Sequence, residues 1–243
     1  MAFPAEKGRY HLYVTYSCPF ACRALSARNL LGLEDVISVS IAHPMYQKTK
    51  PNDASDEHKG WVFVDPATSA TMVGANGRHG GPGAAYILGA CLWDKKKGTI
   101  VSEESTGILR TLDSGFRDLV PSNVHLYPED CERNIDAVND GICAETNEEL
   151  TKLDELLTKK RFLIGKSVTE ADVRLFHTLI RLDSYQQTTD KHLTDYHNIE
   201  QYLRELYQIP ELKSTVNWYH APHVTAEGPF VDYDAAHDRA KLE

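Results

Sequence analysis

The 243-residue sequence has only five cysteines, an odd number. Such a sparse set does not make a disulfide framework, which excludes a small secreted scaffold held together by disulfides. The sequence also has no Asn-x-Ser/Thr glycosylation sequon, and its start shows no apolar segment of signal-peptide length. We therefore expect a protein of the reducing cytoplasm.

Long apolar runs are absent as well, because no stretch approaches the roughly 20 residues that a membrane-spanning helix needs. Basic residues are not in excess, since 26 Lys and Arg against 35 Asp and Glu give a formal net charge of −9. An acidic chain of this kind is a poor candidate for nucleic-acid binding. We expect neither a membrane nor a nucleic-acid partner, and the 42% hydrophobic and 25% charged residues indicate a globular protein.

Metal-binding patterns are missing too. Eleven histidines are present, but none stands in a His-Glu-x-x-His motif or pairs with a cysteine at zinc spacing. The sequence therefore predicts no metal site.

The first half of the chain predicts two strands around a helix, followed by a hairpin and a second helix. Aromatic and β-branched residues indicate the strands, and Ala- and Leu-rich residues at helical spacing indicate the helix between them. The predicted elements are strands at 9–16 and 35–42, helices at 20–31 and 103–112, and a hairpin over 90–94 and 99–102. This order predicts a thioredoxin-like α/β domain over residues 1–112.

The second half predicts helices. Residues 113–129 contain two prolines and are predicted to form a linker, so the helical domain is expected over 130–243. Thr169 followed by Asp172 is a helix start signal, a hydroxyl cap with an acid three residues on. The expected helices are 131–158 in one or two pieces, 169–185, 199–207 and a short one over 214–220.

Cys18 is the residue that the pattern favours for chemistry. It stands where the first strand turns into the first helix, and Pro19 suits the opening helical turn. The positive end of the helix dipole favours a thiolate there, which is a nucleophile toward sulfur. The alternative is a small apolar residue packed under the helix. For Cys22, four residues later, we expect such a packing role.

Several ordered blocks of the sequence resemble the xi class of glutathione transferases, the glutathionyl-hydroquinone reductases. The likeness covers about residues 9 to 220 and includes Cys18-Pro19-Phe20-Ala21, Gly32 to Ile37, Leu92-Trp93-Asp94-Lys95, Thr99 to Ser105 and Thr169 to Phe176. The resemblance implies the two-domain glutathione transferase fold, α/β plus all-α, with a thioredoxin-like domain before a helical domain. It also implies glutathione as co-substrate and a homodimer.

The resemblance also assigns roles to residues. Cys18 would attack a glutathionylated hydroquinone and carry the glutathionyl group as a mixed disulfide, which a second glutathione resolves. Glutathione contacts are expected from Trp61, Gly89, Ala90, Glu104 and Ser105. The small aromatic or quinone-like electrophile is expected to contact Phe20, Cys143, Arg181 and Tyr185.

The sequence departs from the family pattern at three places. Ala90 stands where the family has a cis-proline, so the Gly89–Ala90 bond is either trans or a strained cis bond. Cys143 replaces a tyrosine of the acceptor pocket, and a Tyr-Tyr pair after the last helix is missing. These changes leave two alternatives open: an enzyme that acts on another electrophile by conjugation, isomerisation or dehalogenation, or a non-catalytic glutathione-binding protein.

Overall fold

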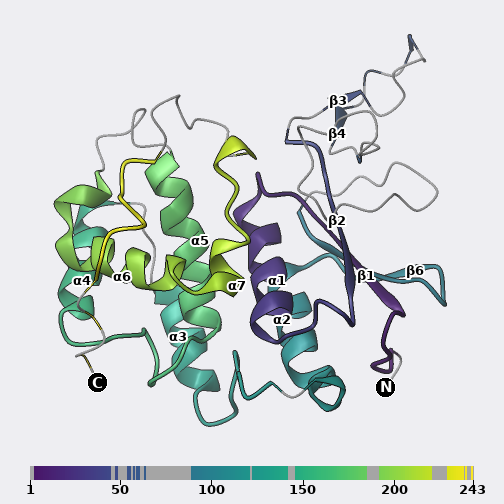
Figure 1. Ribbon diagram of the computed structural model, residues 1–243, viewed down its shortest axis with the longest axis horizontal. Coiled ribbons are helices and arrows are strands. Elements are labelled where there is room, and N and C mark those ends of the chain that lie inside the picture. Colours follow the sequence, from purple (N-terminus) through teal and green to yellow (C-terminus); the bar gives the residue numbers. More distant parts are fainter. Residues whose placement is uncertain are drawn as a thin grey trace. The chain divides into compact units, whose positions relative to one another are not determined.

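The computed structural model describes residues 3–44, 47–48, 54–55, 57, 59–60, 63, 89–120, 122–141, 146–184, 192–220, 229–237, 239 and 242. By its internal contacts the chain divides into an N-terminal unit, Met1–Ser122, and a C-terminal unit, Asn123–Glu243. Figure 1 follows the chain from purple to yellow, with the remaining residues in grey.

The N-terminal unit is built on a four-stranded mixed sheet with the strand order β2-β1-β5-β6. The central strand β1 pairs in parallel with β2 and antiparallel with β5, and β5 pairs antiparallel with β6. The strands are β1 Tyr10–Val14, β2 Ser38–Ile41, β5 Cys91–Asp94 and β6 Thr99–Ser102, and a separate short pair joins β3 Gln47–Lys48 to β4 Lys59–Gly60. The predicted order of strands and helices in this half is confirmed.

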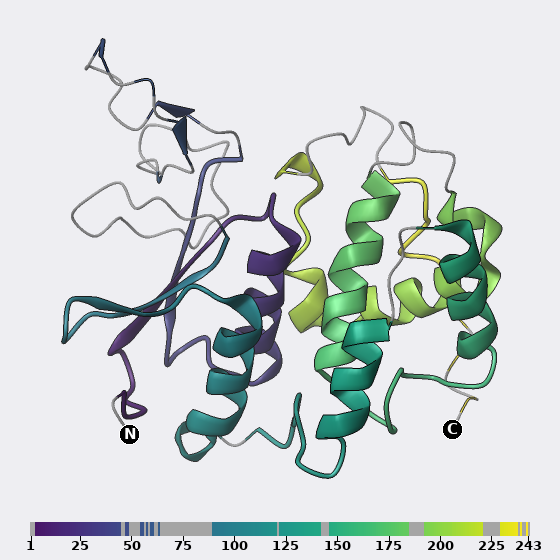
Figure 2. The same ribbon diagram turned by 180° about the vertical axis from the view of Figure 1, so that it is seen from behind.

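Two helices of the N-terminal unit lie side by side against the sheet, as both views in Figures 1 and 2 show. They are α1 Pro19–Leu30 and α2 Ser105–Gly115, and a 3₁₀ turn η1 Arg117–Leu119 follows α2. Leu12 of β1 is fully buried, as are Ile108 and Leu112 of α2. Burying these apolar side chains holds helices and sheet together.

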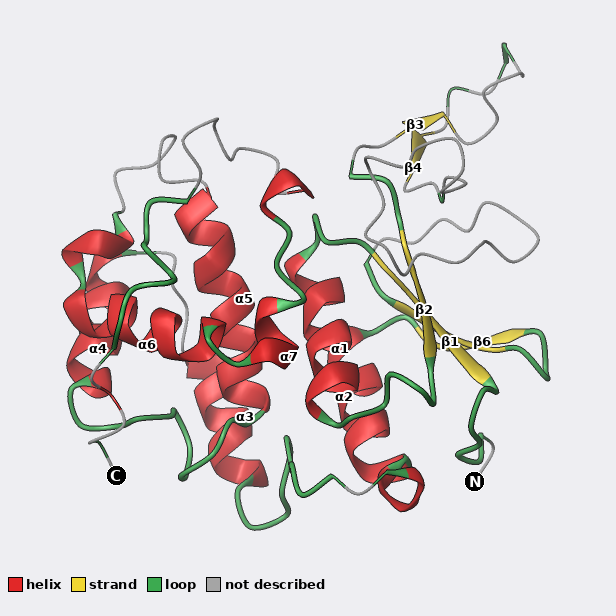
Figure 3. Cartoon of the chain, viewed as in Figure 1, coloured by secondary structure: helices red, strands yellow, loops and turns green. Residues whose placement is uncertain are grey.

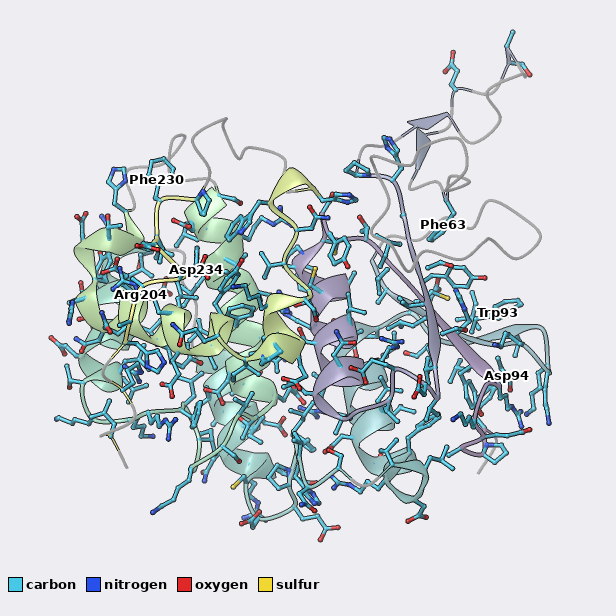
Figure 4. The ribbon with its side chains drawn as sticks, viewed as in Figure 1. Phe63, Trp93, Asp94, Arg204, Phe230 and Asp234 are labelled. Carbon is cyan, nitrogen blue, oxygen red and sulfur yellow. The ribbon has the colours of Figure 1, made fainter. Side chains whose placement is uncertain are left out.

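A second apolar cluster of this unit is formed by Tyr13, Cys91, Phe63 and Trp93. The rings of Tyr13 and Phe63 meet edge to face at 5.1 Å, and Figure 4 labels Phe63 and Trp93. Because neighbouring residues of a strand face opposite sides of the sheet, Tyr13 packs on the side away from Leu12. Both faces of the sheet therefore carry buried apolar residues.

The C-terminal unit is helical, and its helices are red in Figure 3. Helix α5 packs against both α3 and α6, and α4 packs against α6. The helices are α3 Glu132–Gly141, α4 Asn147–Leu157, α5 Glu170–Ser184, α6 His197–Tyr207 and α7 Pro210–Lys213, with 3₁₀ turns η3 Leu193–Asp195 and η4 Trp218–His220.

The start of α5 is fixed by a fully buried carboxylate, as the start signal predicts. Asp172 accepts hydrogen bonds from the Thr169 N–H and hydroxyl, both at 2.9 Å. It also accepts from the Leu163 N–H at 2.9 Å and from the Tyr202 hydroxyl at 2.8 Å. Burial raises the pKa of Asp172, because no water solvates the carboxylate. One side chain thus joins α5, α6 and the turn before α5.

Some predicted element bounds are wrong. The helix expected at 103–112 begins and ends later, at Ser105–Gly115, so the segment expected to begin a linker at residue 113 is still helical. The segment expected to form a short helix over 214–220 has only the 3₁₀ turn at its end, and a helix that the sequence analysis missed begins before it at Pro210. Proline is favoured at the first helical position, where its missing N–H leaves no intrahelical bond unmade.

Candidate active site

The sheet topology brings three predicted site segments to one edge of the N-terminal unit. Strand β1 runs toward this edge and leads into the Cys18 turn. Strand β5 runs the opposite way, and because Tyr13 near the end of β1 pairs with Cys91 at the start of β5, Gly89 and Ala90 precede β5 at the same edge. Strand β6 returns to that edge, with Ser102 opposite Leu92. The N-termini of α1 and α2 therefore both follow strands that end at this edge.

Cys18 is the N-cap residue of α1. Its backbone is extended, with φ −106° and ψ 117°, and its carbonyl accepts the first helical hydrogen bond from the Cys22 N–H at 3.1 Å. The Cys18 N–H donates to the Thr15 carbonyl at 3.3 Å. Cys18 is half-buried. The thiol thus stands at the positive end of a helix, partly open to reagents, as nucleophilic cysteines do.

The turn before Cys18 is held by two hydroxyl residues that the sequence analysis did not select. Thr15 is buried, and its hydroxyl oxygen accepts from the Ser17 N–H at 3.2 Å. The Ser17 hydroxyl donates to the Pro44 carbonyl at 3.1 Å, which ties the turn to the segment after β2. The signal was present in the sequence, because Ser and Thr before a helix commonly make such local bonds.

Two other cysteines of the N-terminal unit are buried in the packed interior. Cys22 is 4% exposed, and its thiol lies 3.6 Å from the Tyr16 carbonyl. Cys91 is 3% exposed, and burial raises its pKa to about 11. The packing role expected for Cys22 is confirmed.

The Gly89–Ala90 segment lies directly against the sulfur of Cys18. A Cβ placed on Gly89 would stand 3.8 Å from Cys18 Sγ. No cis peptide bond occurs among the described residues, so the Gly89–Ala90 bond is trans. The sequence left a trans bond and a strained cis bond open as alternatives, and the structure has the trans bond. Ala90 itself is buried.

The N-terminus of α2 is capped by Glu104. The Glu104 carboxylate accepts hydrogen bonds from the N–H groups of Thr106, at 2.8 Å, and Gly107. Its own N–H donates to the Ser102 hydroxyl at 3.2 Å. The Glu104 carboxylate thus pairs with free N–H groups of the first helical turn, and Ser105 is buried as the first residue of the helix.

Phe20 presents an apolar surface near the start of α1. Its side chain is 54% exposed, unusually open for phenylalanine. The guanidinium of Arg23 lies over its ring at 4.5 Å from the centroid. A cation over one face of an aromatic ring fixes the orientation of that ring.

Comparisons with known proteins agree with the resemblance. The family model of the glutathione S-transferase C-terminal domain matches residues 136–205. The glutathionyl-hydroquinone reductase YqjG of Escherichia coli is 34% identical, over 98% of this chain and 84% of that protein. Its glutathione-bound structure matches with a TM-score of 0.79 at 32% identity, over 98% of this chain and 90% of that one. The xi glutathione S-transferase of Phanerochaete chrysosporium has a TM-score of 0.73 at 31% identity, over 91% and 81%.

This chain belongs to the xi class of glutathione transferases. It is thus an enzyme of the glutathione transferase superfamily, and the predicted fold is confirmed: a thioredoxin-like N-terminal unit and a helical C-terminal unit. The α/β and all-α halves of this xi-class protein follow the order expected from its sequence.

For several predicted contacts of this xi-class chain the structure gives no position relative to Cys18. Trp61, Cys143 and Tyr185 lie outside the described residues. Arg181 belongs to α5 of the C-terminal unit, where it is half-buried. The structure therefore brings together Cys18, Gly89 and Ala90, and it places the N-terminus of α2 at the same sheet edge.

Two absences hold for the described part of this xi-class chain. No group of three or more His, Cys, Asp or Glu residues there could hold a metal ion. Among the helices with described residues, none has both the length and the apolar character to cross a membrane.

Proposed function

We propose that this protein is a glutathione-dependent reductase that removes glutathione from S-glutathionyl hydroquinones or similar aromatic conjugates. The observation that carries the proposal is the position of Cys18: a half-buried thiol at the N-cap of α1. The relative YqjG is named a glutathionyl-hydroquinone reductase, which supports this substrate class.

The proposed reaction has two steps, in each of which a thiolate attacks a sulfur atom. First, the Cys18 thiolate attacks the sulfur of the conjugate, so that a disulfide bond forms and the bond between sulfur and the aromatic carbon breaks. That carbon takes the electron pair and a proton, which frees the hydroquinone. Second, the thiolate of another glutathione attacks the mixed disulfide, releasing glutathione disulfide and the Cys18 thiolate. Overall, one conjugate and one glutathione give the free hydroquinone and glutathione disulfide, so that one half of the disulfide comes from the conjugate.

The proposed glutathione contacts follow from charge. The exposed Glu104 carboxylate is negatively charged and would pair with the α-ammonium group of the γ-glutamyl end. Ser105 and the positive end of α2 would hold the neighbouring carboxylate. The backbone of Gly89 and Ala90 would border the cysteinyl part, and Trp61 is expected beside the glutathione.

A turnover assay with matched cysteine variants tests the proposal. In C18S the rate of hydroquinone release from its glutathionyl conjugate should fall at least about 10³-fold, as when a covalent nucleophile is removed. C131S is the control, because Cys131 lies in the C-terminal unit, and it should keep wild-type turnover. A protein carrying one glutathionyl group should appear by mass spectrometry in wild type but not in C18S. Full turnover by C18S would contradict the mechanism.

A second candidate function rests on the trans bond at Gly89–Ala90. The family pattern has a cis-proline at the position of Ala90. The trans bond here changes the backbone that borders the sulfur, and this change favours a different electrophile. The same assay run with aryl halides and unsaturated ketones distinguishes the candidates, because turnover restricted to those substrates would replace the reductase assignment. Tight glutathione binding without any turnover would instead indicate a binding protein.

Location and assembly are also proposals. We propose a cytoplasmic protein, because the described cysteines are all free thiols. We propose a homodimer from the family resemblance, and light scattering of the purified protein tests it.

A further inference from the structure

The flank of the Cys18 sulfur that faces β5 is formed by a glycine. Apart from the chain neighbours of Gly89, the sulfur is the only described atom within 4 Å of a Cβ placed on Gly89, at 3.8 Å. Contacts between heavy atoms are optimal near 3.5–4.0 Å, so a methyl group at residue 89 would touch the sulfur without overlapping it. A side chain there would occupy space beside the thiol that, apart from the chain neighbours of Gly89, no other described residue fills within 4 Å of this Cβ.

The backbone does not require glycine at this position. Gly8, Gly32, Gly98 and Gly165 have positive φ, but Gly89 does not. An L-residue at 89 therefore meets no strain of the left-handed kind. What glycine supplies here is space beside the sulfur, and the Ala90 that follows it is buried.

We propose that Gly89 is a specificity-determining residue, which leaves one flank of the Cys18 sulfur open for bulky aromatic groups carried by the sulfur under attack. The inference rests on the proposed function, since it concerns the acceptor side of that reaction. Attack by the thiolate needs the Cys18 sulfur, the sulfur under attack and the leaving group in line, so the substituents of the attacked sulfur must fit around the Cys18 sulfur. A side chain at residue 89 would collide with large substituents and spare small ones.

The test compares the rates at which two reagents modify Cys18. Methyl methanethiosulfonate adds a methylthio group and expels methanesulfinate. The aromatic disulfide 4,4′-dithiodipyridine adds a pyridylthio group and expels thiopyridone. The variants are G89A and G89V. Thermal unfolding shows whether each variant folds, and one folded variant is enough for the test. G115A is the matched control, because a Cβ on Gly115 of α2 meets nothing within 4 Å. C18S gives the background from the other thiols.

We expect both Gly89 variants to react with the aromatic disulfide about 10-fold or more slowly than wild type, since one methyl group in a binding pocket changes rates by about 10- to 200-fold. The rate of their reaction with the methyl reagent should change by less than about twofold. G115A should leave both rates unchanged. Equal slowing of both reagents, or no slowing of either, would overturn the inference.

The outcome separates this inference from the proposed function. If the size selection holds but wild-type protein does not turn over a glutathionyl hydroquinone, only the reductase assignment fails. If turnover holds and depends on Cys18 without any size selection by residue 89, only the role of Gly89 fails.

Discussion

At the residue scale, Cys18 and Cys91 show how position decides what a thiol can do. The two belong to the same unit, yet Cys18 caps a helix and is half-buried, whereas Cys91 is 3% exposed in a central strand. Burial disfavours the charged thiolate and raises the pKa of Cys91 to about 11. Only the thiolate reacts with electrophiles, so the two should differ sharply in rate.

Alkylation by iodoacetamide at pH 7 checks this difference. We expect Cys18 to be modified within minutes, while Cys91 stays unmodified until the protein is denatured. Peptide mass spectrometry of the labelled protein, before and after addition of urea, gives both extents. Equal labelling of Cys18 and Cys91 in the folded protein would contradict the assignment of Cys18 as the nucleophile.

At the element scale, Glu104 carries two roles that a substitution can separate. It caps α2 through Thr106 and Gly107, and we propose that it also pairs with an ammonium group of glutathione. Serine is an equally good N-cap but has no charge. We therefore expect E104S to keep the unfolding temperature and raise the KM for glutathione, whereas E104A should raise KM and also lose about 1 kcal/mol of stability.

The control for this prediction is another helix cap far along the chain. Thr146 caps α4 with a reciprocal bond pair to Glu149. T146A should lower stability by about 1 kcal/mol and leave the KM for glutathione unchanged. Unchanged KM in E104S would remove Glu104 from the proposed glutathione site while leaving its capping role intact.

At the scale of a whole unit, residues after 228 fold back onto the helices of the C-terminal unit. The Tyr233 hydroxyl donates to Asp183 of α5 at 3.0 Å. The buried Arg239 guanidinium donates to the carbonyls of Leu157, at 3.1 Å, and Arg161, at 2.9 Å, near the end of α4. Figure 4 labels Phe230 and Asp234 of this segment and Arg204 of α6, whose guanidinium donates to the Asp232 carbonyl at 2.8 Å.

This arrangement predicts a pH dependence of stability. Burial raises the pKa of Asp183 to about 6, although hydrogen bonds from Tyr233, Val231 and Phe230 partly oppose the effect and the charge of Glu200 adds to it. In the native state Asp183 therefore keeps its proton to a higher pH than in the unfolded chain. The stability that protonated Asp183 contributes is fully present below about pH 4 and is lost as the pH rises through 6. This loss lowers the free energy of unfolding by about 1 kcal/mol between pH 5 and pH 7.

Urea unfolding of wild type and D183N at pH 5 and pH 7 measures this effect. Asparagine does not titrate, so D183N should lack the loss of about 1 kcal/mol that wild type shows over this interval. Comparing the two proteins removes the contribution of every other titrating group. Identical pH slopes would mean that Asp183 does not change its proton affinity on folding.

The sequence alone determined the order of the elements and the family. Local periodicity marks most of the strands and helices, and the Cys18-Pro19 pair after an aromatic strand marks the proposed nucleophile, because these signals depend only on neighbouring residues. Helix ends were predicted less accurately, since the helix expected from residue 103 begins at Ser105, after its N-cap Glu104.

Only the tertiary structure decided what surrounds the sulfur. Gly89 is 71 positions from Cys18 in the chain, yet a Cβ on Gly89 would lie 3.8 Å from Cys18 Sγ. The two meet because antiparallel pairing sets the start of β5 beside the end of β1. Likewise, Asp183 and Tyr233 are 50 residues apart and meet only when the end of the chain folds back. Such contacts depend on how whole elements pack, and no local pattern of residue types specifies them.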